Sequence, residues 1–156
     1  MSCYHTAQIC LNGHLICQSI EEYPDYSQNF CSVCGAQTIT ECPSCHSKLR
    51  GYYDSDFIKP TEVEHYCFNC GQPYPWTSSA IEATQLLIQE DESLDNIQKA
   101  SLIESLPDIA NETPKTKLAV VRLQKALKTV GSFTADGVRQ FALDFGCELA
   151  KKSLGL

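Results

Sequence analysis

The chain has 156 residues, of which 43% are hydrophobic and 20% charged, and its formal net charge is −7. This length suits one domain or two small ones, and this composition is ordinary for a globular protein. The acidic balance argues against wholesale binding to nucleic acid or to an anionic membrane. No run approaches the roughly 18 apolar residues of a membrane span. The first eight residues lack a basic segment followed by an apolar core, so we expect no secretory signal.

The composition changes sharply near residue 76. Residues 1–76 hold nine of the ten cysteines, all four histidines and all seven tyrosines. Residues 77–156 hold one cysteine and neither histidine nor tyrosine. We therefore predict two domains, 1–76 and 77–156. No Gly/Ser-rich linker separates them, so we expect the two domains to be in contact.

Short strand-like segments punctuated by turns make up the first half. The expected strands cover residues 4–9, 15–20, 48–53 and 62–66. None of them is long enough to bury a hydrophobic core by itself, so another stabilising device has to replace that core.

A tight turn in the first of these hairpins carries two metal-ligand residue types. Asn12-Gly13 favours a tight turn, because both residues tolerate positive φ. That turn brings Cys10 and His14 together, which is half of a tetrahedral metal site.

Three Cys-x-x-Cys knuckles follow in the chain. They are Cys31/Cys34, Cys42/Cys45 and Cys67/Cys70. Each knuckle places two sulfurs at about the separation that a tetrahedral Zn²⁺ requires. Gly35 and Gly71 follow two of the knuckles, where a left-handed residue closes the turn, and His46 takes this position in the other.

Eight ligands make two closed sets of four, and we predict two zinc ions per chain. Sequential pairing joins Cys10/His14 with Cys31/Cys34, and Cys42/Cys45 with Cys67/Cys70, as in two tandem zinc ribbons. An interleaved, cross-braced pairing is the alternative. We favour sequential pairing, because seven residues separate Cys34 from Cys42, more than the two or three expected in a cross-brace.

The ligand types favour zinc, although a four-cysteine set could also hold iron. Cys17 lies on the strand after His14 and is an alternative fourth ligand to it. His5, His46 and His65 are expected to be ordinary polar residues. Because every metal position can be filled by Cys or His, the sites are expected to be structural, and we do not expect an enzyme.

The second half has the pattern of about four helices. Ser79 and Glu82 form a capping box for the first helix, and Asp95 begins a second helix that Pro107 ends. Thr113-Pro114 begins a third helix, which runs through residue 130. Ser132 or Thr134 begins the last helix, which runs through residue 153. The predicted class is therefore α+β: two small tandem zinc ribbons of short β-hairpins, followed by an α-helical domain.

Two features carry candidate functions. Aromatic side chains surround the second ribbon, namely Tyr52, Tyr53, Phe57, Tyr66, Phe68, Tyr74 and Trp76, and we expect them mainly to pack. The 113–130 helix carries cations on one face, namely Lys115, Lys117, Arg122, Lys125 and Lys128, with no acid between them. The preferred function is a protein–protein interaction or regulatory adaptor, with homo-oligomerisation through the C-terminal helices as one option. The alternative is nucleic-acid binding through the ribbon aromatics and this basic face, although the first domain has only Lys48, Arg50 and Lys59 against eight acids.

The motifs also resemble a known family. They are HTAQICLNGH at residues 5–14, FCSVCG at 30–35, CPSC at 42–45 and CFNCGQPYPW at 67–76. They are similar to a family of small bacterial zinc-ribbon proteins of unknown function, over roughly the first 80 residues. The resemblance implies zinc binding and a bacterial, cytoplasmic source, and it implies no activity.

Overall fold

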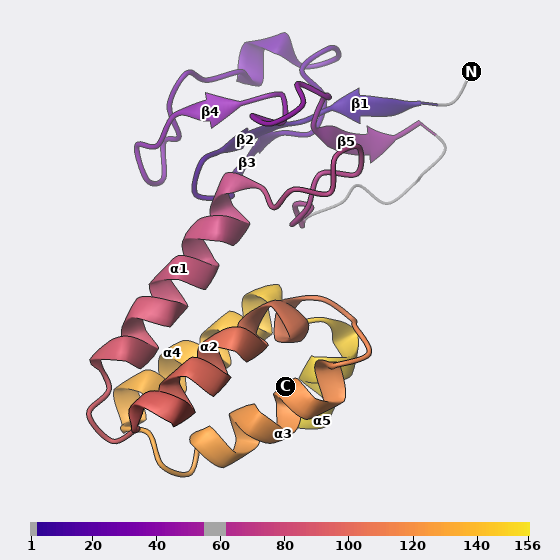
Figure 1. Ribbon diagram of the computed structural model, residues 1–156. Helices are drawn as coiled ribbons and strands as arrows, with labels where there is room; N and C mark the ends of the chain where they lie inside the picture. Colours follow the sequence, from indigo (N-terminus) through magenta and orange to yellow (C-terminus); the bar gives the residue numbers. More distant parts are fainter. Residues whose placement is uncertain (1–2, 55–61) are drawn as a thin grey trace. The chain divides into compact units, whose positions relative to one another are not determined.

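The structure is a computed structural model that describes residues 3–54 and 62–156 (Figure 1). Phe57 and Lys59 lie outside the described residues. The chain divides into two compact units, Met1–Ser79 and Ala80–Leu156. The class is α+β, as the sequence predicts: short antiparallel strands in the first half precede five α-helices within the described residues.

Two small antiparallel sheets form the first unit. Strand β1 (Tyr4–Thr6) pairs with β5 (Arg50–Tyr53), and β2 (Gln8–Cys10) lies between β3 (Leu15–Cys17) and β4 (Thr38–Ile39). The single strand expected over residues 4–9 is therefore two strands. The break falls at Ala7, which donates its N–H to the carbonyl of Leu49 at 2.9 Å while the chain changes sheets.

Two further strand predictions were wrong. Residues 62–66 form no strand, and only Tyr66 makes an isolated bridge, with Pro73. Strand β4 was not predicted, because it has two residues and exists through its pairing with β2. Such pairing joins segments far apart in the chain and leaves little local signal. A short 3₁₀ helix, η1 (Pro24–Tyr26), follows β3.

The apolar core of the first unit is small. It contains Ala7, Ile9, Leu49, Tyr74 and Trp76 besides the buried cysteines. Tyr74 and Trp76 stack with ring centroids 4.8 Å apart, so these two aromatics pack as expected. Gly13, with φ +89°, lies against Trp76, and a Cβ at this glycine would come within 3.0 Å of the Trp76 side chain. The Asn-Gly turn thus needs glycine both for its backbone conformation and for this close approach.

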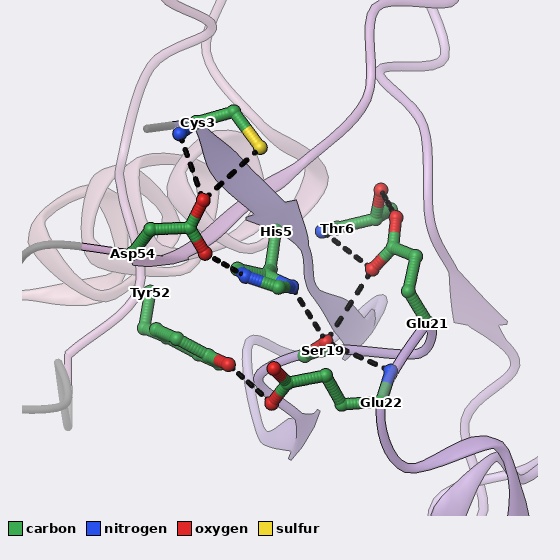
Figure 2. Close-up of polar contacts among 8 residues, drawn as sticks. All are labelled: Cys3, His5, Thr6, Ser19, Glu21, Glu22, Tyr52 and Asp54. Atoms are coloured by element: carbon green, nitrogen blue, oxygen red, sulfur yellow. Dashed lines mark hydrogen bonds and ion pairs between the residues drawn. The ribbon is translucent and has the colours of Figure 1, made fainter. Parts of the chain in front are cut away.

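A polar network links β1 to β5 and to the turn after β3 (Figure 2). His5 contacts the Ser19 hydroxyl at 2.9 Å through Nδ1 and the Asp54 carboxylate through Nε2, and its ring stacks on Tyr52. Asp54 also accepts the backbone N–H of Cys3 at 3.0 Å. The network thus joins three short segments that are far apart in the chain.

The carboxylate of Glu21 extends this network toward β1. It accepts the Thr6 N–H at 3.0 Å and the Thr6 hydroxyl at 2.5 Å. The Tyr52 hydroxyl donates to the neighbouring Glu22. Two adjacent acids after β3 thus anchor the two strands of the β1–β5 sheet, Glu21 at β1 and Glu22 at β5.

The helices are α1 (Pro75–Glu90), α2 (Asn96–Ala110), α3 (Thr116–Ala126), α4 (Ser132–Phe145) and α5 (Glu148–Leu154). The second unit has a conventional core of buried aliphatic and aromatic side chains, among them Ile88, Leu102, Leu106, Ile109, Leu123, Val138 and Phe141. Each such side chain contributes about 1.5–3 kcal/mol on burial. No helix in the described residues has the length and apolarity needed to cross a bilayer.

Two helix boundaries correct the sequence prediction. Helix α1 begins at Pro75 rather than near Ser79, because proline suits the first turn of a helix. Helix α2 continues through Pro107 to Ala110. Tertiary contacts compensate for the proline: Ile109 and Ala110 are buried, and the Ile109 carbonyl accepts the Cys147 N–H at 2.9 Å.

The remaining helices are shorter than expected. Thr113 and Pro114 form a turn before α3, in which the Lys115 N–H donates to the Thr113 hydroxyl at 3.1 Å, and α3 ends at Ala126 rather than Val130. The single helix expected through residue 153 is two, α4 and α5. Gly146 and Cys147 between them are extended, with ψ values of 143° and 160°.

The network around His5 predicts a pH-dependent contribution to stability. The hydrogen bond with His5, and then that from the Cys3 N–H, lower the pKa of Asp54. A depressed carboxyl pKa stabilises the fold above the pKa of the unfolded chain, about 3.9, and this contribution is lost as the pH falls through the folded-state pKa. We expect Asp54→Asn to lower the urea midpoint at pH 7, and the difference from the wild type to shrink below about pH 4.

The single tryptophan, Trp76, lies in the first unit and reports its unfolding by fluorescence. Asp25 is exposed and makes no hydrogen bond or ion pair through its carboxylate within the described residues, so Asp25→Asn serves as the matched control. A pH-independent difference between Asp54→Asn and the wild type would contradict the assignment.

Candidate metal centres

All four half-sites are closed by a residue with positive φ. These residues are Gly13 (φ 89°), Gly35 (73°), His46 (61°) and Gly71 (72°). Gly13 lies between Cys10 and His14. Gly35, His46 and Gly71 directly follow the second cysteine of their knuckles. In L-residues this conformation costs about 1–2 kcal/mol, which explains glycine at three of the positions. Among the described residues, His46 is the one non-glycine residue with a positive φ.

The three Cys-x-x-Cys knuckles share one backbone pattern. In each, the backbone carbonyl of the first cysteine accepts a hydrogen bond from the N–H of the positive-φ residue, at 2.8 Å for Gly35, 2.9 Å for His46 and 2.8 Å for Gly71. The N–H of each first cysteine donates to the carbonyl five residues on, and a β-bridge flanks each knuckle. The turn at Cys10 is similar but shorter. In it the Gly13 N–H donates to the Cys10 carbonyl, and the Cys10 N–H donates to the His14 carbonyl.

The structure brings the predicted ligands together in two groups. The first contains Cys10, His14, Cys31 and Cys34, and the second contains Cys42, Cys45, Cys67 and Cys70. Within each group all ligand atoms lie within 4.8 Å of one another. This arrangement is that of two sequential sites, and it differs from a cross-brace.

Distances between ligand atoms in the first group are close to tetrahedral values. The Cys10 and Cys34 sulfurs are 3.8 Å apart. The His14 Nδ1 atom lies 3.4 Å from the Cys10 sulfur and 3.6 Å from that of Cys31. His14 therefore presents Nδ1 to the group.

The second group consists of four sulfurs. Cys42 and Cys70 are 3.8 Å apart and Cys45 and Cys67 are 3.6 Å apart, measured between sulfur atoms. Cys42 and Cys67 are buried, whereas Cys45 and Cys70 are partly exposed.

These distances pass a direct geometric test. A tetrahedral ion with metal–sulfur bonds of about 2.3 Å separates its sulfur ligands by about 3.8 Å, and with a metal–nitrogen bond of about 2.0 Å it separates sulfur from nitrogen by about 3.5 Å. Both groups match these values. A disulfide, by contrast, requires a sulfur–sulfur distance of about 2.05 Å. The two groups can therefore each hold one metal ion.

Side-chain donors surround the sulfurs, and these were not predicted from the sequence. The Ser47 hydroxyl lies 3.1 Å from the Cys45 sulfur and 3.2 Å from that of Cys67. Asn69 donates to Cys45 at 3.5 Å, and Asn12 donates to Cys34 at 3.4 Å. The sequence did contain a signal for the two asparagine contacts, because Asn12 and Asn69 each lie inside a ligand turn. An asparagine side chain there can donate to a neighbouring thiolate as well as favour the turn.

The environment favours thiolates at particular positions. Burial opposes ionisation of Cys67, but the hydrogen bonds from Ser47 and from backbone N–H groups prevail and lower the pKa of its thiol to about 5. The Ala36 N–H, and then the Asn12 side chain, help to lower the pKa of Cys34 to about 6. For Cys70, the Gln72 N–H favours the thiolate, yet burial and the adjacent sulfurs raise the pKa to about 12. At Cys70 the adjacent sulfurs thus oppose ionisation, and a cation between them would remove that opposition.

The remaining cysteines lie outside both groups. Cys17 is buried and directs its thiol to the Ser19 carbonyl at 3.2 Å, so His14, and not Cys17, is the fourth member of the first group. Cys3 contacts Asp54, and Cys147 packs on the core of the second unit. His46 is exposed, and the His65 carbonyl accepts the Thr77 hydroxyl at 2.7 Å.

One other cluster has the composition of a hydrolase triad, Asp54, His5 and Ser19 (Figure 2). A serine nucleophile has to reach a substrate carbonyl. The Ser19 residue is 0% exposed, and its hydroxyl also accepts the Glu22 N–H at 3.1 Å. This serine is enclosed by its own turn, and the cluster is a structural network.

A family model matches residues 3–154, nearly the whole chain. The chain belongs to the family described as uncharacterized protein conserved in bacteria (DUF2321). The family therefore includes the helical unit as well as the metal-ligand half, whereas the sequence motifs indicated a resemblance over only the first 80 residues. Its description names neither a zinc ribbon nor an activity. No curated protein and no solved structure matches the chain.

The hydrogen bonds of Ser47 predict a selective effect on metal affinity. Replacing an outer hydrogen-bond partner of a metal ligand commonly costs about 10–100-fold in affinity. We expect Ser47→Ala to weaken metal binding at the Cys42/Cys45/Cys67/Cys70 group by at least about tenfold and to leave the other group unchanged. Competition with a chromophoric chelator measures both affinities.

Ser44 provides the matched control. It lies in the same knuckle, it is exposed, and Ser44→Ala removes the same hydroxyl type without removing a contact to sulfur. Equal affinities for the Ser47 and Ser44 variants would show that the Ser47 hydroxyl does not support the sulfur ligands.

Proposed function

We propose that this chain is a non-enzymatic zinc-binding protein of the bacterial cytoplasm that acts as a protein–protein interaction or regulatory adaptor. In this proposal two zinc ions stabilise tandem ribbons in the first unit. The observation that carries the proposal is that both ligand groups are complete sets of four, with tetrahedral spacing.

Zinc is the preferred metal for these donors. A set of three thiolates and one imidazole is common in structural zinc sites, and four thiolates suit zinc or iron. One metal type for both groups is the simpler assignment, since the first group includes His14 and is unlike an iron–thiolate site. Cys10, His14, Cys31 and Cys34 would hold one ion, and the four sulfurs of the second group the other.

Closed ligand sets support a structural rather than a catalytic role. A catalytic zinc keeps one position open for water or substrate, whereas here four protein ligands surround each centre. The Ser19 cluster is enclosed as well. We therefore assign the metals to folding and not to chemistry.

Exposed apolar side chains support an interaction role. On the described surface, Val33 in the first knuckle is 77% exposed, Ile97 in α2 is 82% exposed and Phe133 in α4 is 81% exposed. Single exposed apolar residues are ordinary, but large β-branched and aromatic ones on rigid turns and helices suit contacts with a protein. Assembly of two copies through the helices is one form that such a contact could take.

Nucleic-acid binding is the second candidate, and one observation favours it. The Arg50 guanidinium lies between the exposed rings of Tyr4 and Phe68, at 4.8 Å and 4.4 Å from their centroids, which is a surface on which bases could stack. However, Arg50 is paired with Glu64, and Lys48 lies 3.9 Å from Glu21. Few cations therefore remain for phosphates among the described residues of this unit.

The zinc assignment predicts two zinc ions per chain. Plasma emission spectrometry of protein purified without added metal should give that stoichiometry. Chelation should unfold the first unit and leave most of the helical circular-dichroism signal, because zinc binding supplies on the order of 10 kcal/mol per site while the second unit has its own apolar core. One metal ion or none would refute the assignment of two sites.

Cys31→Ser tests the pairing within the same experiment. It should release the zinc of the first group and leave that of the second. The control Cys17→Ser alters a buried cysteine outside both groups and should retain both ions. Loss of both ions from Cys31→Ser alone would mean that the two sites fold as one unit.

The adaptor assignment predicts weak binding to nucleic acid. Nucleic-acid affinity from phosphate contacts falls steeply with salt. We expect no submicromolar affinity for mixed-sequence duplex DNA or single-stranded RNA at physiological salt in fluorescence-anisotropy titrations of the zinc-loaded chain. Submicromolar affinity that falls steeply with added salt would reverse the ranking of the two candidates.

A further inference from the structure

A hollow between α2 and α3 combines an apolar floor with positive charge. Its volume is about 310 Å³, and its lining includes Leu94, Ile97, Leu102, Arg122, Lys125 and Ala126. The residues of each helix recur at spacings of three or four, so each helix contributes one continuous face. Within the helices the lining runs from Ile97 to Leu102 of α2 and from Arg122 to Ala126 of α3, which is at most about one and a half helical turns, or about 8 Å.

The floor of the hollow is made by the core and its rim by exposed side chains. Leu94 and Leu102 are 5% and 3% exposed and belong to the hydrophobic core. Ile97, in the first turn of α2, is 82% exposed beside them. An aliphatic side chain from a partner could therefore contact both a rigid floor and the free face of Ile97.

The charge at the hollow is opposite to that of the chain as a whole. Its lining contains two cations, Arg122 and Lys125, and no carboxylate. The chain has a formal net charge of −7. The Arg122 guanidinium is positioned by Glu104 at 3.6 Å and by the Ser105 hydroxyl at 3.4 Å, whereas Lys125 makes no ion pair within the described residues.

We infer that this hollow is the docking site for an acidic amphipathic helix of a partner protein. The inference rests on the proposed adaptor function and gives it a location. Apolar side chains at i and i+3 or i+4 of the partner would fill the hollow, as in helix-in-groove recognition. Carboxylates beside them would pair with Arg122 and Lys125.

An apolar hollow suits a protein better than a nucleic acid here. A phosphate backbone needs several cations and gains nothing from Leu94, Ile97 or Leu102. The electrostatic complementarity would instead select among protein helices by their charge, because like charges facing each other across an interface are repelled.

The test uses two fluorescein-labelled peptides of about 16 residues, long enough to form helix in water. Both have leucines at i, i+4 and i+7, and the other positions are alanine with glutamate in one peptide and with lysine in the other. Anisotropy with the zinc-loaded full chain should show the glutamate peptide binding at least about tenfold more tightly, which is about 1.4 kcal/mol.

The double variant Arg122→Glu/Lys125→Glu should reverse this preference and bind the lysine peptide more tightly. Its matched control is Lys115→Glu/Lys117→Glu, which makes the same charge change at exposed positions outside the hollow. The control should keep the preference for the glutamate peptide. Ile97→Ser should weaken binding of both peptides, and circular dichroism should show all three variants folded.

Three outcomes would overturn the inference: no preference between the peptides, no binding, or equal effects of the two double variants. A 20-nucleotide single-stranded RNA that outcompetes the glutamate peptide in an Arg122/Lys125-dependent manner would also overturn it. If a protein partner captured by the wild type still binds Arg122→Glu/Lys125→Glu and Ile97→Ser, the adaptor function stands and the docking site lies elsewhere. Absence of any protein partner would instead remove the adaptor function itself.

Discussion

The tight turn with a positive-φ residue is the element on which the first unit depends. It occurs at Gly13, Gly35, His46 and Gly71, and it orients both members of each ligand pair to the same side of the chain. The strands around these turns are only two to four residues long. Left-handed backbone at His46 costs about 1–2 kcal/mol. A zinc ion of the proposed kind, at on the order of 10 kcal/mol, outweighs that cost, which explains how a non-glycine residue can occupy the position.

The two units are stabilised by different physical means. The first has a small apolar core, the hydrogen-bond network around His5 and the eight metal-ligand groups. The second has a continuous cluster of buried aliphatic and aromatic side chains and no ligand group among its described residues. The second unit can therefore present a surface whose shape does not depend on metal, whereas in the proposed function the fold of the first unit does depend on it. An adaptor that combines the two would couple a partner-binding helix surface to a metal-dependent module in the same chain.

The cations of the 113–130 segment illustrate how tertiary structure changes the meaning of a sequence pattern. On a helical wheel they form one basic face, which is compatible with phosphates and with acidic proteins alike. In the fold, Arg122 and Lys125 lie beside an apolar hollow to which α2 contributes Ile97, whereas Lys115 and Lys117 lie outside it. Charge next to an apolar floor favours an amphipathic partner over a polyanion, because only the amphipathic partner gains from burial as well as from charge.

The sequence by itself determined the eight candidate ligands that the structure groups, the turns that carry them and the α+β class, because each depends on spacing within a few residues. Cys-x-x-Cys and Asn-Gly specify a local backbone, and a helical period specifies an apolar face. Only the tertiary structure decided that residues 4–9 divide between two sheets, that β4 exists, that α2 passes Pro107 and that an extended pair separates α4 from α5. It also decided the pairing of the ligand groups. The sequence favoured sequential pairing but left a cross-brace open, and the structure groups the ligands sequentially. Each of these depends on contacts between segments far apart in the chain, such as Ala7 with Leu49 and Cys147 with Ile109, for which neighbouring residues carry no signal.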